Sequence, residues 1–209
     1  MRILLDSWRF WRRSAQAPPP GEWRTWLFLG GRGAGKTRAG AEWVAQQVRK
    51  RRARRVALIG ATHADVRQVM IEGESGLLAV SEGAQYEPSL RRVRWPGTGA
   101  RATVLSADEP DSIRGHQFDL AWGDEFCKWP EPQKALDMLR MTLRLGPDPR
   151  LMITTTPRPI APLLDLRTSA DCETTVSATQ DNHQLPDVDD VGPNQMLTLE
   201  LETIQSPAS

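Results

Sequence analysis

The sequence contains few cysteines and no long apolar run, and both shortages narrow the class of protein. Cys127 and Cys172 are its only cysteines, which excludes a small fold held together by several disulfides. No apolar run approaches the ~18–20 residues of a membrane-spanning helix. The apolar residues that follow Met1 are too few for the core of a secretory signal. We therefore expect a cytoplasmic protein with reduced thiols and no membrane contact.

Acidic residues are scarce in the first part of the chain. Residues 1–60 carry 14 Lys/Arg against 3 Asp/Glu, whereas residues 165–209 carry 1 against 9, although the whole chain has a formal net charge of only +1. The densest basic run covers residues 49–55. Such a run indicates either a polyanionic partner, because Lys and Arg neutralise phosphates, or a solvated helix end, where cations suit the helix dipole. Both interpretations stay open at this point.

One glycine-rich stretch matches the whole phosphate-binding P-loop pattern, G-x-x-x-x-G-K-[ST]. Residues 25–29 before it form a short apolar run that predicts a buried strand, and residues 37–48 after it have apolar positions at helical spacing. A strand, a glycine-rich loop and a helix are the context that this motif requires. The pattern consists of Gly30, Gly31, Arg32, Gly33, Ala34, Gly35, Lys36 and Thr37.

The residue types of this loop suit the phosphates of a nucleotide. Glycines allow backbone conformations in which successive N–H groups turn inward, and the following helix adds the positive end of its dipole. Lys36 can then reach the β- and γ-phosphates, and the Thr37 hydroxyl can hold Mg²⁺. The alternative is a glycine-rich turn that binds nothing, and the complete pattern between a strand and a helix argues against it.

Apolar runs alternate with helical patterns along the chain, which predicts an α/β fold with a mainly parallel sheet flanked by helices. Composition suggests an arm at residues 1–22, a P-loop domain at residues 23–166 and a poorly structured C-terminal tail at residues 167–209. We expect the arm to pack on the domain rather than to stack on bases. Further strands are expected at 56–60, 118–123 and 151–154, helices at 64–72 and 132–143, and a hairpin around residues 96–99; the pattern also allows a strand at 174–178.

Two adjacent acids follow the predicted strand at residues 118–123. Asp124 would reach the carboxyl edge of the sheet beside the P-loop, where ligands of open α/β sheets bind. Asp124 would hold the metal shell, and Glu125 would orient and deprotonate an attacking water. The alternative is a strand that ends in two solvated acids. A complete P-loop earlier in the chain favours the catalytic interpretation.

Hydrolysis also requires positive charge at the transition state and a response to the loss of phosphate. Arg32 inside the P-loop and Arg114 are the two candidates for a stabilising arginine, which acts either in cis or in trans. Either one could instead be a surface or ion-pair arginine. Thr154, Thr155 and Thr156 end a predicted core strand, and their hydroxyls are candidates for sensing the γ-phosphate. A strand end closed by a Thr-Pro pair would look the same.

Three stretches together resemble the ATPase domain of a large terminase subunit, the DNA-packaging motor of tailed phages, prophages and gene transfer agents. The resemblance lies in residues 23–43, which contain the P-loop, in residues 112–125, which end in the acidic pair, and in residues 153–159, which contain the three threonines. It covers about residues 20–165.

The resemblance implies a P-loop NTPase of the additional-strand type that uses ATP and Mg²⁺ to pump double-stranded DNA through a portal ring into a procapsid. It implies nucleotide binding by Lys36 and Thr37, metal binding by Asp124, a catalytic base at Glu125 and a coupling motif at residues 154–156. It also implies a portal protein, a small terminase subunit and a homo-oligomeric ring as partners. Family members normally carry a nuclease domain as well, and we expect none in this chain, in which about forty residues follow the ATPase core.

Other functions fit parts of the same pattern. A helicase-like ATPase shares the P-loop and the acidic pair, but it would require a second α/β domain with arginine fingers. A truncated remnant that binds nucleotide without turnover is the alternative from a different class. A small-molecule kinase fits less well, because the basic first part of the chain and the adjacent Asp124 and Glu125 suit attack by water.

Overall fold

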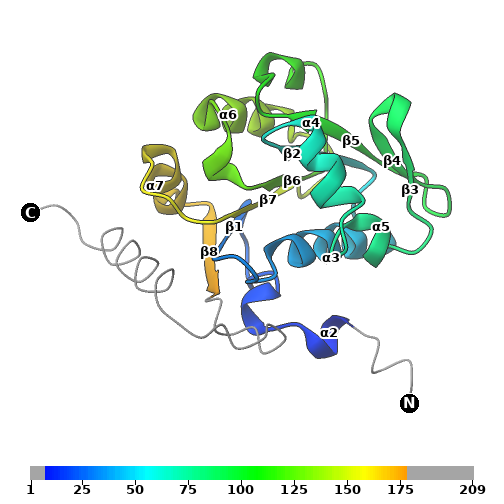
Figure 1. Ribbon diagram of the computed structural model, residues 1–209, viewed down its shortest axis with the longest axis horizontal. Helices are drawn as coiled ribbons and strands as arrows, with labels where there is room; N and C mark the ends of the chain where they lie inside the picture. The colour runs from blue at the N-terminus through cyan, green and yellow to red at the C-terminus, as the bar shows by residue number, and fades with distance from the viewer. Residues whose placement is uncertain (1–7, 178–209) are drawn as a thin grey trace, which may run out of the picture.

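The computed structural model describes residues 8–177, which form one sheet with helices on both faces (Figure 1). The sheet has eight strands in the order β3-β4-β5-β2-β6-β7-β1-β8. The expectations for residues 178–209 lie outside the described residues. The strands are β1 (Thr25–Gly30), β2 (Arg55–Gly60), β3 (Gln85–Glu87), β4 (Arg92–Trp95), β5 (Ala100–Ser106), β6 (Leu120–Asp124), β7 (Arg150–Thr155) and β8 (Cys172–Ser177).

The sheet is mainly parallel, as predicted. Strands β5, β2, β6, β7, β1 and β8 pair in parallel, whereas β3 and β4 form an antiparallel extension beside β5. Strand β7 lies between β6 and β1, which is the additional-strand order expected from the resemblance. Thr154 of β7 is in register with Phe28 of β1 on one side and with Asp124 of β6 on the other. The order therefore brings the acidic pair and the threonines next to the P-loop strand.

Helices cover both faces of the sheet. In Figure 1, α6 and α7 lie on one side of the sheet, and α3 and α5 lie on the other. The helices are α2 (Trp8–Trp11), α3 (Lys36–Arg49), α4 (His63–Asp65), α5 (Leu77–Val80), α6 (Pro132–Thr142) and α7 (Ala161–Thr168). A π-helical turn, η2 (Val66–Ile71), continues α4, and short 3₁₀ turns occur at η1 (Ser14–Gln16), η3 (Pro88–Leu90), η4 (Pro110–Ile113) and η5 (Phe126–Lys128). Among the described residues, no helix is long and apolar enough to cross a membrane.

Strand β1 shows why the core has two halves. Its successive side chains point to opposite faces, so Trp26 and Phe28 enter the core under α3, while Leu27 and Leu29 enter the core under α6 and α7. Trp26 and Phe28 stack with ring centroids 6.0 Å apart. A strand that is buried on both faces requires a continuous apolar sequence, which is the pattern that identified this strand from the sequence.

Several elements differ from the sequence-based expectations. The helix expected at residues 64–72 is α4 followed by the π-helical turn, and it starts at a reciprocal cap in which Asp65 N donates to Thr62 Oγ1. The strand expected from residue 118 begins at Leu120, because the Asp119 carboxylate accepts the backbone N–H groups of Arg54 and Arg55. The pattern predicted neither β3 nor the short helices α5 and α7.

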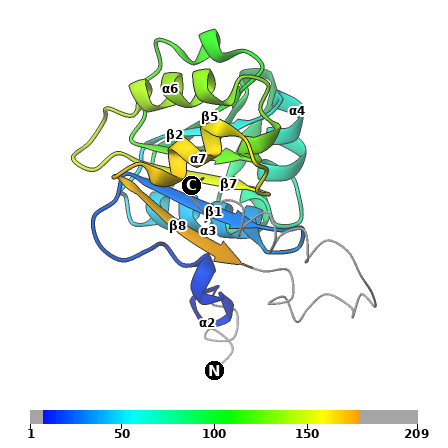
Figure 2. The same ribbon diagram turned by 90° about the vertical axis from the view of Figure 1, so that its left-hand side faces the viewer.

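The strand that the pattern allowed near the C-terminus exists as β8. It pairs in parallel with β1 along its whole length, from Thr25 opposite Cys172 to Gly30 opposite Ser177. Figure 2 shows β8 at the outer edge of the sheet beside β1. The sheet therefore continues past residue 166, the expected end of the domain. Tertiary pairing stabilises a strand whose polar sequence gives only a weak local signal.

Candidate active site

The P-loop connects the end of β1 to the start of α3, at the carboxyl edge of the parallel strands. Gly33 and Gly35 have φ angles of 74° and 75°, a region that favours glycine. Gly30 is needed for a different reason: a Cβ atom there would lie 2.6 Å from the Cβ of Ala34. The loop therefore has a compact turn whose shape depends on glycine at each of these positions.

Lys36 is held at the centre of the site by four neighbours. Its Nζ donates hydrogen bonds to Gly30 O at 2.8 Å, to Gly31 O at 3.0 Å and to Thr156 Oγ1 at 3.1 Å. It also forms an ion pair of 3.5 Å with Glu125 Oε1. The lysine is only 7% exposed. A buried ammonium group with this many partners is held in a fixed position beside the glycine-rich turn.

The segment before β1 supports the P-loop from outside. Arg13 Nη2 donates to the carbonyl oxygen of Ala34, and Gln16 Nε2 donates to the carbonyl oxygen of Gly35 at 3.3 Å. The Gln16 side chain is buried, and a Cβ atom on Gly35 would lie 2.2 Å from its Nε2. The described part of the arm thus packs against the P-loop through Arg13 and Gln16. Sequence analysis did not single out these two residues, because no local pattern links them to a loop about twenty positions later.

Asp124 ends β6 with a buried carboxylate. Its Oδ1 lies 2.5 Å from Thr154 Oγ1, which in turn accepts a hydrogen bond of 3.1 Å from Trp122 Nε1. Burial raises the pKa of Asp124 to about 6, and the hydrogen bond from Thr154 opposes this shift. The second oxygen, Oδ2, forms no hydrogen bond within residues 8–177. The site thus contains a desolvated carboxylate with one oxygen available to a further partner.

Glu125 occupies an unusual backbone conformation directly after the strand. Its φ and ψ are 51° and 50°, the left-handed region that residues with a side chain rarely adopt. Besides Lys36, its carboxylate faces Lys128 Nζ at 3.7 Å and accepts a hydrogen bond of 3.4 Å from Thr156 Oγ1. Backbone conformations of this kind cost of order 1–3 kcal/mol and cluster at functional sites. The turn directs Glu125 toward the P-loop lysine, whereas Asp124 stays in line with the strand.

Each of the three threonines contacts a different part of the site. Thr154 contacts Asp124, as described above. Thr155 Oγ1 accepts the backbone N–H of Cys127 at 3.0 Å. Thr156 lies between Lys36 and Glu125 and contacts both. Burial raises the pKa of the neighbouring Cys127 thiol, which disfavours its thiolate form.

The structure brings most predicted site residues together, with one clear exception. Lys36, Glu125 and Thr156 contact one another, and the Asp124–Thr154 contact lies beside them at the ends of β6 and β7. Thr37 follows Lys36 in the first turn of α3. Arg32 is exposed on the P-loop. Arg114 lies apart from these residues, on the side of α6: its Nε lies 3.3 Å from Met138 Sδ, and its Nη2 is 3.7 Å from Asp111.

Comparisons with known proteins agree with this architecture. The structure resembles the ATPase domain of the Thermus phage P74-26 large terminase, with a TM-score of 0.63, 16% identity and coverage of 88% of this chain and 94% of that one. It resembles the large terminase of the thermophilic bacteriophage D6E in complex with ADP, with a TM-score of 0.65, 15% identity and coverage of 79% and 42%. It also resembles the HK97 bacteriophage large terminase, with a TM-score of 0.61, 15% identity and coverage of 85% of this chain and 38% of that one.

Because all of the identities are low, these structural likenesses establish the fold alone. The described chain spans less than half the length of the D6E and HK97 proteins. No curated protein sequence matches it significantly. The family model described as "Terminase large subunit, T4likevirus-type, N-terminal" matches residues 27–184, which is most of the chain. The chain therefore belongs to the terminase large-subunit family and corresponds to its N-terminal region.

Proposed function

We propose that this chain binds and hydrolyses ATP as the motor domain of a terminase large subunit, and so drives the packaging of double-stranded DNA into a procapsid. One observation carries the proposal: Lys36, Asp124 and Glu125 converge at the carboxyl edge of the sheet, beside the P-loop turn. Family membership supports the motor role. The D6E relative in complex with ADP supports the choice of nucleotide.

Nucleotide binding would use the P-loop in the usual way for this motif. The backbone N–H groups of residues 30–37 would cradle the phosphates. Lys36 now donates to the carbonyl oxygens of Gly30 and Gly31 and would exchange these contacts for phosphate oxygens. Because Lys36 also pairs with Glu125, the same exchange would release the Glu125 carboxylate.

Mg²⁺ fits the donor set of this site. A threonine hydroxyl and a carboxylate are hard oxygen ligands, and Asp124 has one oxygen without a hydrogen bond in the described part of the chain. We assign Thr37 and Asp124 as the protein ligands. The ion would neutralise negative charge on the phosphates.

Water activation falls to Glu125 in this proposal. Its carboxylate would orient a water molecule and accept the proton as that water attacks the γ-phosphate. Thr156 contacts both Glu125 and Lys36, so loss of the γ-phosphate would change the partners of Thr156 first. Thr154 and Thr155 would pass that change to β6 and to the loop after it. This gives residues 154–156 a coupling role.

Two arginines and several partners complete the proposed assembly. Arg32 is placed to stabilise charge in its own subunit, because it belongs to the P-loop. Arg114 lies on the α6 side, away from its own P-loop, which suits a role in a neighbouring subunit of a homo-oligomeric ring. The portal protein and the small terminase subunit are the further proposed partners. The place of action is the bacterial cytoplasm, at the portal of the procapsid.

The test is ATP hydrolysis by the purified chain, with and without duplex DNA, beside Glu125→Gln. We expect this variant to bind nucleotide normally and to lose turnover by ~10²-fold or more, the scale of general-base catalysis. Glu131→Gln is the matched control, because Glu131 is an exposed acid on the same segment whose nearest cation is Lys134. Near-normal turnover of Glu125→Gln would show that another residue activates the water.

A further inference from the structure

The edge of the sheet opposite the P-loop carries a continuous set of cations, which we call the basic edge. These side chains are exposed, and within residues 8–177 none of them forms an ion pair with a carboxylate, although Arg55 interacts electrostatically with Asp119. The basic edge consists of Arg24, Arg49, Lys50, Arg51, Arg52, Arg54, Arg55, Arg101 and Arg144.

Topology explains why residues far apart in sequence meet here. Strands β5, β2, β6, β7 and β1 are parallel neighbours, so they all begin at this edge. Arg55 and Arg101 are register partners on β2 and β5, and Arg24 directly precedes β1. Arg144 is fixed beside the start of β6, because its N–H donates to Phe118 O at 3.2 Å. Helix α3 ends at Arg49 and delivers the remaining cations.

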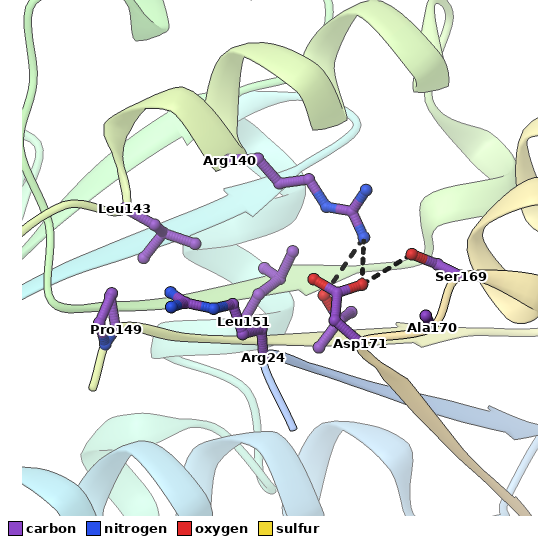
Figure 3. A pocket seen from close by; sticks show the side chains of 9 residues that line it. Arg24, Arg140, Leu143, Pro149, Leu151, Ser169, Ala170 and Asp171 are labelled. Carbon is purple, nitrogen blue, oxygen red and sulfur yellow. Dashed lines mark hydrogen bonds and ion pairs between the residues drawn. The ribbon is translucent and has the colours of Figure 1, made fainter. Parts of the chain in front are cut away.

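Two hollows open along the basic edge. One, of about 330 Å³, is lined by polar side chains and contains no carboxylate; Arg55, Arg101, Thr103, His116 and Gln117 are among its lining residues. The other, of about 460 Å³, lies between the starts of β1, β7 and β8 and the end of α6 (Figure 3). In it Arg140 turns toward Asp171, whereas the Arg24 guanidinium extends away from that carboxylate. Each hollow thus offers at least one arginine that has no acidic partner in residues 8–177.

The carboxylates near this edge already have partners. Asp119 accepts the N–H of Arg54 at 2.8 Å and that of Arg55 at 3.1 Å. Asp148 pairs with Arg150 at 2.7 Å, and Asp171 pairs with Arg140 at 3.8 Å. Two of these acids are thus neutralised by an arginine outside the basic edge, whereas Asp119 keeps its charge and interacts with Arg55. The cations of the edge still outnumber this single acid, and an excess of positive charge attracts a polyanion. A solvated end of α3 would account for the run at residues 49–55, but not for the cations contributed by β1, β5 and the start of β6.

We propose that the basic edge binds the phosphate backbone of double-stranded DNA. The proposed function is used only to identify the polyanion; the surface itself follows from charge and topology. Five neighbouring strands about 4.8 Å apart make an edge of about 19 Å. A duplex carries one charge per ~1.7 Å, so a stretch of that length presents about eleven phosphates.

The edge suits a duplex better than a single strand. Single strands are held by aromatic side chains on which bases stack. Among the described side chains, the exposed large aromatic is Trp11. It belongs to α2, whose Trp8 packs under Arg38 in the first turns of α3, at the other end of that helix. Arginines without a stacking platform contact phosphates and not bases.

Helix α3 would connect this surface to the nucleotide site. It has 14 residues, begins with Lys36 of the P-loop and ends with Arg49 of the basic edge. At 1.5 Å per residue the helix spans about 21 Å. Trp122 and other core residues pack along it, so we expect any displacement of its first turn to be carried along the whole helix. A change in the P-loop would therefore reach the DNA contacts through one helix.

The experiment measures binding to a short labelled duplex between about 50 and 200 mM salt, the range over which phosphate contacts are revealed. Two edge variants, Arg49→Gln with Arg52→Gln and Arg55→Gln with Arg101→Gln, are compared with a control, Arg67→Gln with Arg91→Gln. The control residues are also exposed, but Arg67 pairs with Glu72, and Arg91 lies by His63 near Asp108 and Glu109.

We expect each edge variant to lose affinity and the control to keep it. Each lost phosphate contact removes about 0.9 from the slope of log K against log salt, which is about an eightfold loss at 0.1 M salt. All three proteins should keep basal ATP turnover, because none of the changed residues touches the nucleotide site. Equal losses in all three, or no loss in the edge variants, would overturn the proposal.

Two further measurements, competition by another polyanion and binding of a single strand, test whether the ligand is duplex DNA. An equally charged polyglutamate that competes as well as the duplex would show a surface that is merely basic, and would overturn the assignment to DNA. A single strand that binds as tightly as the duplex would overturn the preference for a duplex. Edge-dependent DNA binding without ATP turnover would support this inference while refuting the proposed function. If the unmodified chain hydrolysed ATP but did not bind the duplex, that result would refute this inference and leave the proposed ATPase activity supported.

Discussion

The two edges of the parallel sheet hold charged groups in opposite ways. At the carboxyl edge, Lys36, Asp124 and Glu125 are largely buried, and each contacts at least one other residue of the site. At the amino edge the side chains of the basic edge are exposed, and none of them forms an ion pair with a carboxylate among residues 8–177. Chemistry on a phosphate requires groups that are pre-positioned and shielded from water. Holding a mobile polyanion requires charges that stay hydrated and exchangeable.

This difference between the two edges predicts that replacing Lys36, at the carboxyl edge, has the largest effect on nucleotide affinity. Lys36→Ala should weaken nucleotide binding by about 10–100-fold or more, because charge-assisted hydrogen bonds contribute ~1.5–3 kcal/mol each. Arg52→Ala at the amino edge should leave nucleotide affinity unchanged. Calorimetric titration with ATP measures both. An unchanged affinity of Lys36→Ala would remove the P-loop from the site.

The layer between the two edges should be intolerant of added volume. A Cβ atom on Gly40 of α3 would lie 2.2 Å from Cε2 of Trp122, whose Nε1 donates to Thr154 beside Asp124. Gly40→Ala should therefore destabilise the fold by about 1–3 kcal/mol, although alanine is the better helix former. Gly97→Ala is the control, because a Cβ atom there meets nothing within 4 Å. Denaturant unfolding compares the two, and a more stable Gly40→Ala would contradict this packing.

The smallest effect is expected where the arm supports the P-loop. Gln16→Ala removes two hydrogen bonds, the one donated to Gly35 O and the one accepted from Arg13 N, and each bond of this kind contributes roughly 0.5–1.5 kcal/mol. We expect a lower thermal midpoint for this variant and an unchanged one for Ser14→Ala, which lies in the same turn but is exposed. Equal midpoints for both variants would show that the arm does not brace the loop.

Local sequence patterns were sufficient to predict the central strands and the P-loop. The strands at residues 25–29, 56–60 and 151–154 were predictable because burial on both faces requires continuous apolar runs. The P-loop was predictable because its chemistry requires adjacent glycines, a lysine and a hydroxyl in a fixed order. The order β6-β7-β1 agrees with the additional-strand fold that the resemblance implied.

Other features depend on contacts that no local pattern encodes. Strand β8 has a polar sequence and exists because β1 offers it an unpaired edge. Arg13 and Gln16 reach the P-loop because the chain folds back before β1. Arg114, which sequence alone left as a candidate in cis or in trans, lies on the α6 side of the sheet.

Local sequence thus determined the glycine-rich loop, the acidic pair and the strands of the parallel sheet, since each depends on neighbouring residues. Tertiary structure alone decided which groups share an edge. The Lys36–Glu125 pair and the basic edge both join residues from separate parts of the chain, and the strand order that brings them together is set by long-range packing that no short stretch of sequence contains.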